Sequence, residues 1–326
     1  SIAAANGCNA VTTTSSVTVQ PLRNASFNYG ATNTFCQTGS NPTATITGTP
    51  GGTFTSAPAG LSIDANTGAI NLATSTLNSY TVTYTTPGPC AESLTLNIAV
   101  TSAPSANFSY ANSSYCTSST NPTPVFGAGA SGGVFSATPS GLSINASTGE
   151  ITLATSTPGT YTVTNNIAAG GGCASASAST TLTVTALPQA SISYSSPNFC
   201  LGNTSTQNVS LTGNTGGVYS ALPGGLSINT STGAVIPSSS TVNAYTVSYT
   251  IAASGGCPSV TATTALAITP VPAANITYAG NPFCASVSSP QAVTQSGTTG
   301  GTYSASPAGL SINTSTGAIT PSTSTP

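Results

Sequence analysis

Short segments in which apolar and polar residues alternate run along the whole chain. In residues 103–186 they read "ANFSY", "VFSAT", "TYTVTN" and "TLTVT". A period of two puts one face of a segment in a core and the other in water, which is the pattern of a half-buried β-strand. No segment shows the 3.6-residue period of a helix. The chain is therefore predicted to be all-β.

These segments recur with a period near 84 residues. The phrase "GLSIDANTG" at 60–68 returns in closely related form at 141–149, 225–233 and 309–317. Segments of the types "ASFNY", "GGTF" and "SYTVTY" recur at the same spacing. This period is too long for one coil of a solenoid and suits one small β-sandwich.

The sequence pattern of each repeat predicts seven short strands. In residues 103–186 "ANFSY", "TPVFGAG" and "GGVFSAT" come first, "GLSI" and "EITLAT" form a hairpin around "NASTG", and "GTYTVTNNI" and "STTLTVTA" follow. The predicted fold is a series of tandem Ig-like or cadherin-like seven-strand sandwiches of about 84 residues each, arranged as an elongated rod. The predicted divisions are 1–21 (last strands of a preceding repeat), 22–102, 103–186, 187–270 and 271–326 (incomplete).

Two recurring residue types have expected structural roles. A glycine that closes the hairpin suits a positive φ, at Gly68, Gly149, Gly233 and Gly317. A tyrosine starts the sixth strand, at Tyr80, Tyr161 and Tyr245. Each of these tyrosines either forms a tyrosine corner, with its hydroxyl bonded back to the backbone, or is a plain core aromatic.

Both ends of the sequence fall inside a repeat. Ser1 aligns with Thr250 and Pro326 with Val242. The favoured interpretation is a stretch of a longer, nearly periodic chain. The alternative is a filament subunit that completes its last sandwich with strands of the next subunit. The absence of a "YTVSY" strand from both ends weakens this alternative.

Composition excludes several classes of partner. The chain has one basic residue, Arg23, and three acidic residues, Asp64, Glu92 and Glu150. Nucleic acids and anionic lipids require clustered Lys and Arg, so neither is an expected partner. With 38% hydrophobic residues in strict register, the chain is expected to fold, and no apolar run is long enough for membrane insertion.

The sequence offers no catalytic, cofactor-binding or metal-binding group. It contains no His and no Lys, so a serine nucleophile would lack a base. Asp64 and Glu150 lie in the recurring hairpin, where other copies have Asn and Ala. Calcium sites need several carboxylates at each joint between repeats, and the joints have none. The chain is predicted not to be an enzyme and to need no cofactor.

Eight cysteines alternate between two positions of the repeat. One follows an aromatic residue after the first strand, and the other precedes the last strand, often after Gly-Gly. Without His or CxxC pairs, disulfides in an oxidising, extracellular setting are a better interpretation than a metal site. The first set is Cys36, Cys116, Cys200 and Cys284, and the second is Cys8, Cys90, Cys173 and Cys257.

Three pairing schemes are open. The favoured scheme joins the two cysteines of one repeat, as Cys36–Cys90, Cys116–Cys173 and Cys200–Cys257, with Cys8 and Cys284 unpaired. It requires the first-strand segment to bend back, because a simple strand count puts the two cysteines toward opposite ends of the sandwich. Pairing across a joint would have to bridge two strands that run end to end, with Cα atoms within about 7 Å. The third scheme bonds a cysteine to a loop of a neighbouring repeat.

The phrase "GLSI-D/N-x-x-TG-x-I", followed by "YTVTY" and a Gly-Gly-Cys loop, resembles the Ig-like repeats of very large Bacteroidetes surface proteins, including SprB-type gliding-motility adhesins. The resemblance implies export by the type IX system and a filamentous stalk at the cell surface. The expected function is the non-enzymatic shaft of an extracellular filament or adhesin, for gliding motility or attachment. Its partners are neighbouring repeats or other copies of the filament. The alternatives are a module that binds surface glycans and the strand-donating subunit.

Overall fold

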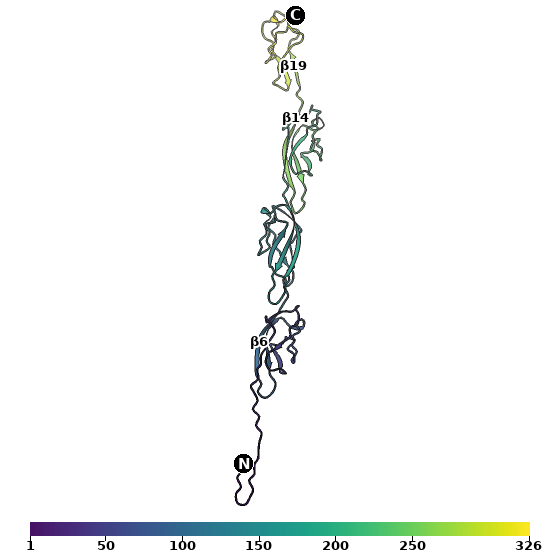
Figure 1. The fold of residues 1–326 in the computed structure, drawn as a ribbon. Helices are drawn as coiled ribbons and strands as arrows, with labels where there is room; N and C mark the ends of the chain where they lie inside the picture. Colours follow the sequence, from purple (N-terminus) through teal and green to yellow (C-terminus); the bar gives the residue numbers. More distant parts are fainter. The chain divides into compact units, whose positions relative to one another are not determined.

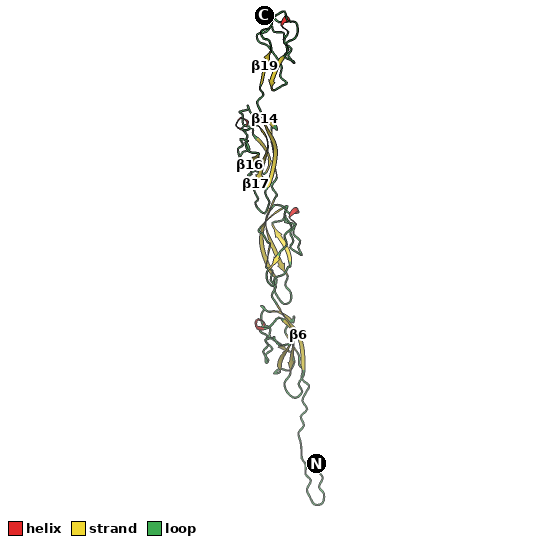
Figure 2. Cartoon of the chain, turned by 180° about the vertical axis from the view of Figure 1, so that it is seen from behind, coloured by secondary structure: helices red, strands yellow, loops and turns green.

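The computed structural model describes all 326 residues, which fold almost entirely into strands and loops (Figure 2). They divide into two compact units. The first contains residues 1–186 together with Gly255–Cys257, and the second contains the rest of residues 187–326. The prediction of an all-β chain of tandem sandwiches is confirmed by the sheets described next.

The first sandwich has six strands in two sheets. β1 pairs with β3, and the second sheet has the order β2-β6-β5-β4. All ladders are antiparallel except that between β2 and β6, which is parallel. The strands are β1 (Phe27–Asn28), β2 (Thr34–Cys36), β3 (Thr45–Ile46), β4 (Thr53–Ala57), β5 (Asn78–Thr85) and β6 (Ser93–Thr101), and the 3-10 helix η1 spans Leu72–Thr74.

The second sandwich, also in the first unit, repeats this topology. β7 pairs with β9, and the other sheet has the order β10-β11-β12-β8. Its elements are β7 (Phe108–Ser109), β8 (Ser114–Cys116), β9 (Val125–Phe126), β10 (Val134–Thr138), η2 (Leu153–Thr155), β11 (Gly159–Ile167) and β12 (Ala176–Thr185).

The second unit holds a third sandwich and a partial one (Figure 1). The third has a β13–β15 pair and a sheet of order β14-β18-β17-β16, whereas the partial one has only the pair β19–β20. The elements are β13 (Ala190–Tyr194), β14 (Asn198–Cys200), β15 (Val209–Gly213), β16 (Val218–Leu222), η3 (Pro237–Ser239), β17 (Asn243–Ile251), β18 (Val260–Thr269), β19 (Ala274–Tyr278), β20 (Val293–Gly297) and η4 (Pro321–Thr323).

The alternating residues of the long strands fill each core. In β5, Tyr80, Val82 and Tyr84 are at most 1% exposed, while the threonines between them face outward. Phe27 of the two-stranded sheet lies edge-on to Phe54 of the other sheet, with ring centroids 5.4 Å apart. The two sheets therefore share one apolar core, and β-branched and aromatic side chains suit its pleated faces.

The strand prediction was wrong at two places in each complete repeat. "GLSI" and "EITLAT" form no strands: a single bridge joins Ile144 to Ile151, and η2 follows. In exchange, the segment with the aromatic-Cys step forms a strand, β8, which the sequence did not predict. It runs parallel to the end of β12, with Cys116 opposite Thr185. Each complete sandwich thus has six strands instead of seven.

The recurring hairpin is held by a tyrosine that ends or directly follows the first strand of each repeat. The Tyr110 hydroxyl donates to the carbonyl of Gly149 at 2.6 Å, and Gly149 has a φ of 73°. Equivalent bonds join Tyr29 to Gly68, Tyr194 to Gly233 and Tyr278 to Gly317. Burial raises the pKa of the Tyr110 hydroxyl well above its usual range, and Tyr115 adds to the shift. The segments "ANFSY" and "GLSINASTG" are therefore joined by this hydrogen bond.

Candidate functional site

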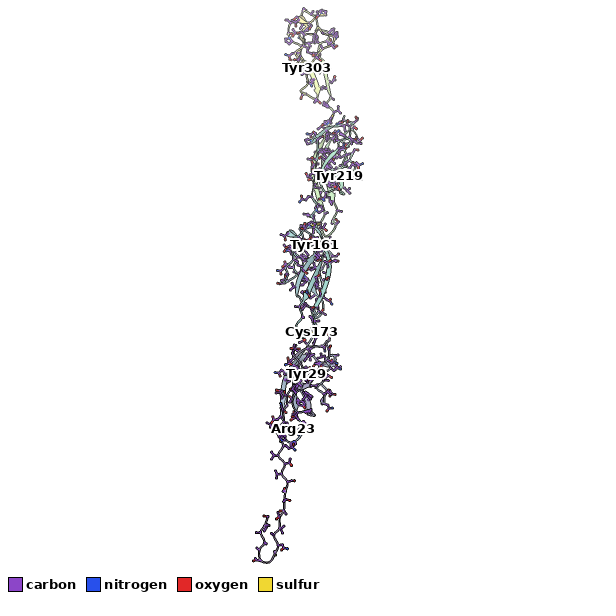
Figure 3. All side chains as sticks on the ribbon, viewed as in Figure 1. Arg23, Tyr29, Tyr161, Cys173, Tyr219 and Tyr303 are labelled. Carbon is purple, nitrogen blue, oxygen red and sulfur yellow. A yellow bond between two sulfur atoms is a disulfide. The ribbon has the colours of Figure 1, made fainter.

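Two disulfides join successive repeats. Cys36 is bonded to Cys173 and Cys116 to Cys257, over sequence separations of 137 and 141 residues. The paired Cα atoms lie 4.7 and 4.6 Å apart, within the usual range for a disulfide. All four cysteines are at most 6% exposed. Cys173 is labelled in Figure 3.

This pairing corrects the favoured scheme. Cys36–Cys90, Cys116–Cys173 and Cys200–Cys257 are not formed; each disulfide instead joins a first-strand cysteine to the loop cysteine of the next repeat, as the third scheme proposed. Cys90, Cys200, Cys8 and Cys284 are unpaired. The physical reason is that the two cysteines of one repeat lie at opposite ends of its sandwich.

Strand pairing sets these positions. We call the end where the chain enters a sandwich proximal and the end where it leaves distal. β2 runs parallel to the last residues of β6, with Cys36 opposite Thr101, so Cys36 lies at the distal end. Cys173 lies in the loop between β11 and β12, at the proximal end of the next sandwich. The distal end of one sandwich thus meets the proximal loop of the next.

Two glycines shape the loop that carries Cys173. Gly170 and Cys173 exchange backbone hydrogen bonds of 3.1 and 2.9 Å around Gly171 and Gly172, whose φ values are 58° and 74°. A two-residue hairpin turn with positive φ at both positions favours Gly-Gly. A Cβ on Gly172 would lie 2.3 Å from the carbonyl oxygen of Thr34. Glycine therefore allows the loop to lie against the backbone of β2.

A hydrogen bond adds to the first joint. The Thr101 hydroxyl donates to the carbonyl of Gly171. Thr101 is the last residue of β6, so the bond joins the end of the first sandwich to the loop of the second. The joint therefore combines a disulfide, a hydrogen bond and close backbone packing.

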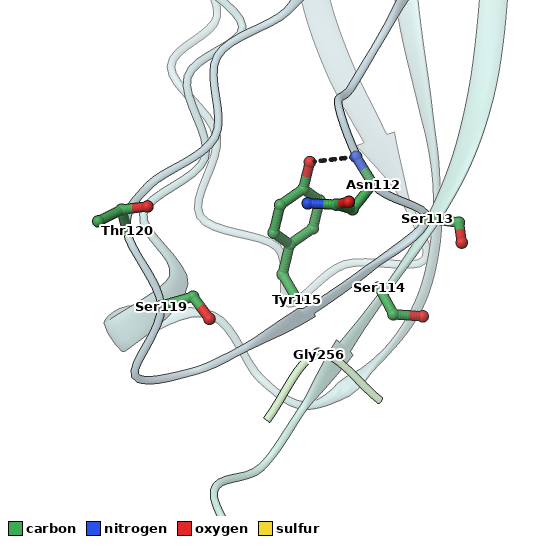
Figure 4. Close-up of a pocket in the computed structure, with 7 residues that line it drawn as sticks. All are labelled: Asn112, Ser113, Ser114, Tyr115, Ser119, Thr120 and Gly256. Atoms are coloured by element: carbon green, nitrogen blue, oxygen red, sulfur yellow. Dashed lines mark hydrogen bonds between the residues drawn. The ribbon is translucent and has the colours of Figure 1, made fainter. Parts of the chain in front are cut away.

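The second joint has the same disulfide and the same close backbone packing. A Cβ on Gly256 would lie 2.7 Å from the carbonyl oxygen of Ser114 and 2.9 Å from the Cα of Tyr115. Beside it lies a hollow of about 510 Å³, where the Tyr115 hydroxyl accepts a hydrogen bond from the backbone N–H of Asn112 at 2.8 Å (Figure 4). Ser113, Ser119 and Thr120 complete its lining. The hollow contains hydroxyl, amide and backbone groups and no charged side chain.

The tyrosines near the start of β5, β11 and β17 bond back to the backbone. The hydroxyls of Tyr80, Tyr161 and Tyr245 donate to the carbonyls of Thr76, Thr157 and Thr241, each four residues earlier. This is the geometry of the tyrosine-corner alternative. The bonds fix the chain where it enters the central strand of each four-stranded sheet, and they involve no reactive group.

The acidic residue of the hairpin has a local structural role. The Asp64 carboxylate accepts hydrogen bonds from the backbone N–H groups of Thr67 and Asn66. These two bonds, with a third from the Thr67 hydroxyl, lower the pKa of Asp64 although it is fully exposed. Asn145 accepts the equivalent backbone bonds in the next copy. The position therefore needs a side-chain oxygen and not a charge.

Nothing in the chain is arranged for metal chemistry. No group of three or more His, Cys, Asp or Glu side chains could hold a metal ion. Among the helices, none is long and apolar enough to cross a membrane.

Comparisons with known proteins add little. No protein-family model matches the chain, and neither does any curated protein. It is similar to mouse cadherin-23 EC22–24 (15% identity, TM-score 0.27, covering 75% of this chain and 98% of that one). It is also similar to titin I-band fragment I67–I69, with 14% identity and a TM-score of 0.39, over 71% of this chain and 92% of that one. Protocadherin gammaB7 EC3–6 has 13% identity and a TM-score of 0.33, over 92% of this chain and 91% of that one. Scores this low carry no functional argument, so the fold class rests on the sheets themselves.

Proposed function

We propose that the chain is a non-enzymatic shaft segment of an extracellular filament or cell-surface adhesin, in which disulfides carry tension from repeat to repeat. One observation carries the proposal: each disulfide joins the distal end of one sandwich to the proximal loop of the next. A link within one sandwich would stabilise only that sandwich. A link between sandwiches also limits the length of chain that is released when one of them unfolds under tension.

The size of the closed loops supports a stabilising role. By chain entropy, loops of 137 and 141 residues each contribute about 5 kcal/mol against unfolding. This is comparable with the whole stability of a small domain. Disulfides persist in oxidising compartments, which fits an extracellular location. The near absence of charge limits ionic attraction to other molecules.

A role in gliding motility or attachment, with export by the type IX system, is the finer part of the proposal and rests on the sequence resemblance alone. The repeat divisions 22–102, 103–186 and 187–270 belong to the same proposal. Expected partners are neighbouring repeats or other copies of the filament. A glycan-binding module is the rival function. The hollow beside Tyr115 is its best candidate site, but it offers no aromatic face beyond that one tyrosine.

Cell detachment under flow tests the proposal. Cells that display the chain between an adhesive tip and an anchor are compared with cells that carry Cys36→Ser and Cys116→Ser. We expect both to attach equally at rest and the variant to detach at lower shear. Gly170→Ala is the matched control, because a Cβ there meets nothing within 4 Å. Equal detachment of all three, or glycan-array binding by the isolated chain, would overturn the shaft function.

A further inference from the structure

The third sandwich has an open cavity that is lined by residues of both its sheets. Its volume is about 320 Å³. The apolar part of the lining comes from Val209 and Leu211 of β15 and from the rings of Tyr219 and Tyr249. The polar part is made by Thr215, Gly216, Gly217, Ser231 and Thr232. The cavity thus joins an apolar wall to hydroxyl and backbone groups, and its lining has no charged side chain.

One tyrosine hydroxyl in this cavity has no partner in the chain. Tyr219, labelled in Figure 3, is 3% exposed, yet its hydroxyl forms no hydrogen bond with any other residue. The neighbouring Tyr249 hydroxyl, by contrast, accepts from the N–H of Gly217 at 2.8 Å and donates to the carbonyl of Asn214 at 3.2 Å. Burial, and then Tyr249, raise the pKa of Tyr219, so its hydroxyl is protonated at neutral pH. This hydroxyl is therefore able both to donate to a ligand and to accept from it.

The hydroxyl of Tyr219 is not required by the fold. The first two sandwiches have phenylalanine at the same place in β4 and β10, as Phe54 and Phe135. Both are buried as deeply as Tyr219. Polar groups in a protein interior are nearly always paired, so one without a partner needs an explanation. Since two sibling cores are built without this hydroxyl, its explanation lies in a ligand.

The third core also lacks a ring that its siblings contain. In the first sandwich, Phe27 lies edge-on to Phe54, with ring centroids 5.4 Å apart, and the second sandwich repeats this arrangement at the same distance. The third sandwich has Ile192 in place of Phe27, and the ring of Tyr219 has no edge-on partner. Aromatic rings favour such partners with centroids about 4.5–7 Å apart. The third core therefore offers an aromatic contact that its own residues do not make.

The cavity lies where such a ring would be placed. In the first sandwich, Phe27 contacts Phe54, faces Tyr84 with ring centroids 6.0 Å apart and is paired with Ile46 across the two-stranded sheet. The counterparts of these three contacts in the third sandwich all line the cavity: Tyr219, Tyr249 and Leu211. Apolar cavities of this kind bind benzene-sized molecules. A six-membered aromatic ring is thus the guest that the surrounding residues fit.

We propose that this cavity binds a neutral ring of phenol size, which packs against Tyr219 and Tyr249 and shares a hydrogen bond with the Tyr219 hydroxyl. A charged ring is disfavoured, because no residue of the lining offers an opposite charge. The phenol is supplied either by a free small molecule or by a tyrosine side chain of a partner polypeptide, which present the same chemistry. The site is a binding function in addition to the shaft, and neither depends on the other.

A titration of the full chain with p-cresol and with toluene, followed by ligand-observed NMR, tests the site. We expect saturable binding, with p-cresol about fivefold tighter than toluene, because only p-cresol can bond to the Tyr219 hydroxyl. The two ligands should bind Tyr219→Phe with equal affinity. Ser220→Ala is the matched control, because it removes an exposed hydroxyl from the other face of the same strand, and it should keep the preference. No saturable binding of p-cresol, or a preference that survives Tyr219→Phe, would overturn the proposal.

A second variant fills the site from inside the protein. Ile192→Phe introduces the phenylalanine that the first two sandwiches carry, so it is expected to fold, and circular dichroism checks this. It should weaken the binding of both ligands at least tenfold. Unchanged binding would show that the ligand lies elsewhere and would overturn the site.

A peptide distinguishes the two sources of the phenol. The peptide acetyl-Gly-Tyr-Gly-amide carries the same ring on a backbone and is titrated in the same way. An affinity equal to that of p-cresol would assign the site to a side chain of a partner polypeptide. An affinity at least tenfold weaker would assign it to a free small phenol.

Discussion

Stretching the chain by its ends would show how the two disulfides are interlocked. Their loops overlap, because Cys116 lies inside the loop closed by Cys36 and Cys173. In the unfolded but oxidised chain, a taut path runs from the N-terminus to Cys36, crosses to Cys173, returns to Cys116 and crosses to Cys257. The extension at full unfolding is limited by this path and not by the length of the chain.

The lengths follow from the connectivity. The taut path contains about 160 residue steps, against about 325 for the reduced chain, and a step spans about 3.5 Å. Reduction should therefore lengthen the fully extended chain by roughly 550 Å. Breaking either disulfide alone should add only about 25 steps, roughly 90 Å, because the other loop still bypasses most of the same residues.

Single-molecule force spectroscopy measures these lengths directly. The four unpaired cysteines are replaced by serine in every sample, so that no other disulfide forms. Cys36→Ser, Cys116→Ser and the double variant are then compared under oxidising conditions. Among the four cysteines that remain, the pairs Cys36–Cys116 and Cys173–Cys257 would close separate loops whose lengths add. Equal and additive increments would therefore refute the interlocked joints.

Three further predictions concern single residues. Gly172→Ala should slow reformation of Cys36–Cys173 in a thiol-titrated refolding assay at least severalfold, because its Cβ would meet the Thr34 carbonyl, whereas Gly170→Ala should match the parent. Asn165 is fully buried, donates to the carbonyls of Ala106 and Ser131 and accepts from the N–H of Gly133. Asn165→Ala should destabilise the second sandwich by about 2–4 kcal/mol in urea unfolding, and a change as small as that of a surface residue would contradict this. Burial first, and then Tyr219, raise the pKa of Tyr194 to about 12, so its protonated form stabilises the fold below pH 10, and this stability is lost as the pH rises from 10 to 12. Thermal unfolding of Tyr194→Phe should show a shallower loss over that range, and parallel curves would contradict the assignment.

The strands and the turn glycines were predictable because their signals are local. Alternation in "TYTVTN" depends only on which face is buried, and β11 spans Gly159–Ile167 where this segment lies. A glycine after "NAST" is needed because φ is 73° there. The strand β8 was missed because it has three residues, and it is defined only by its parallel partner at the end of β12. A signal of that kind is not present in the segment itself.

One buried position of the repeat carries different residue types in different sandwiches. Tyr84 and Tyr249 occupy the same place in two sandwiches, and the hydroxyl of each accepts from the N–H of a glycine before β4 or β16. The second sandwich has Asn165 there, and its side-chain oxygen accepts from Gly133 instead. An isolated Asn inside an alternating strand suggests a surface position. The tyrosines at the same position of the other repeats, Tyr84 and Tyr249, are what indicates that Asn165 is buried.

The cysteine pairing was not predictable from the repeat, for a reason that follows from periodicity. Moving one partner by a whole period keeps its residue type and its place in the repeat, so two loop cysteines, at 90 and 173, are open to Cys36. Chain entropy favours the shorter loop only weakly, by less than about 1 kcal/mol between 54 and 137 residues. The choice is made by which end of the sandwich each cysteine occupies. The one local sign of the joint is "GGGC" before β12, because a loop that must lie against a neighbour's backbone cannot carry a Cβ at Gly172.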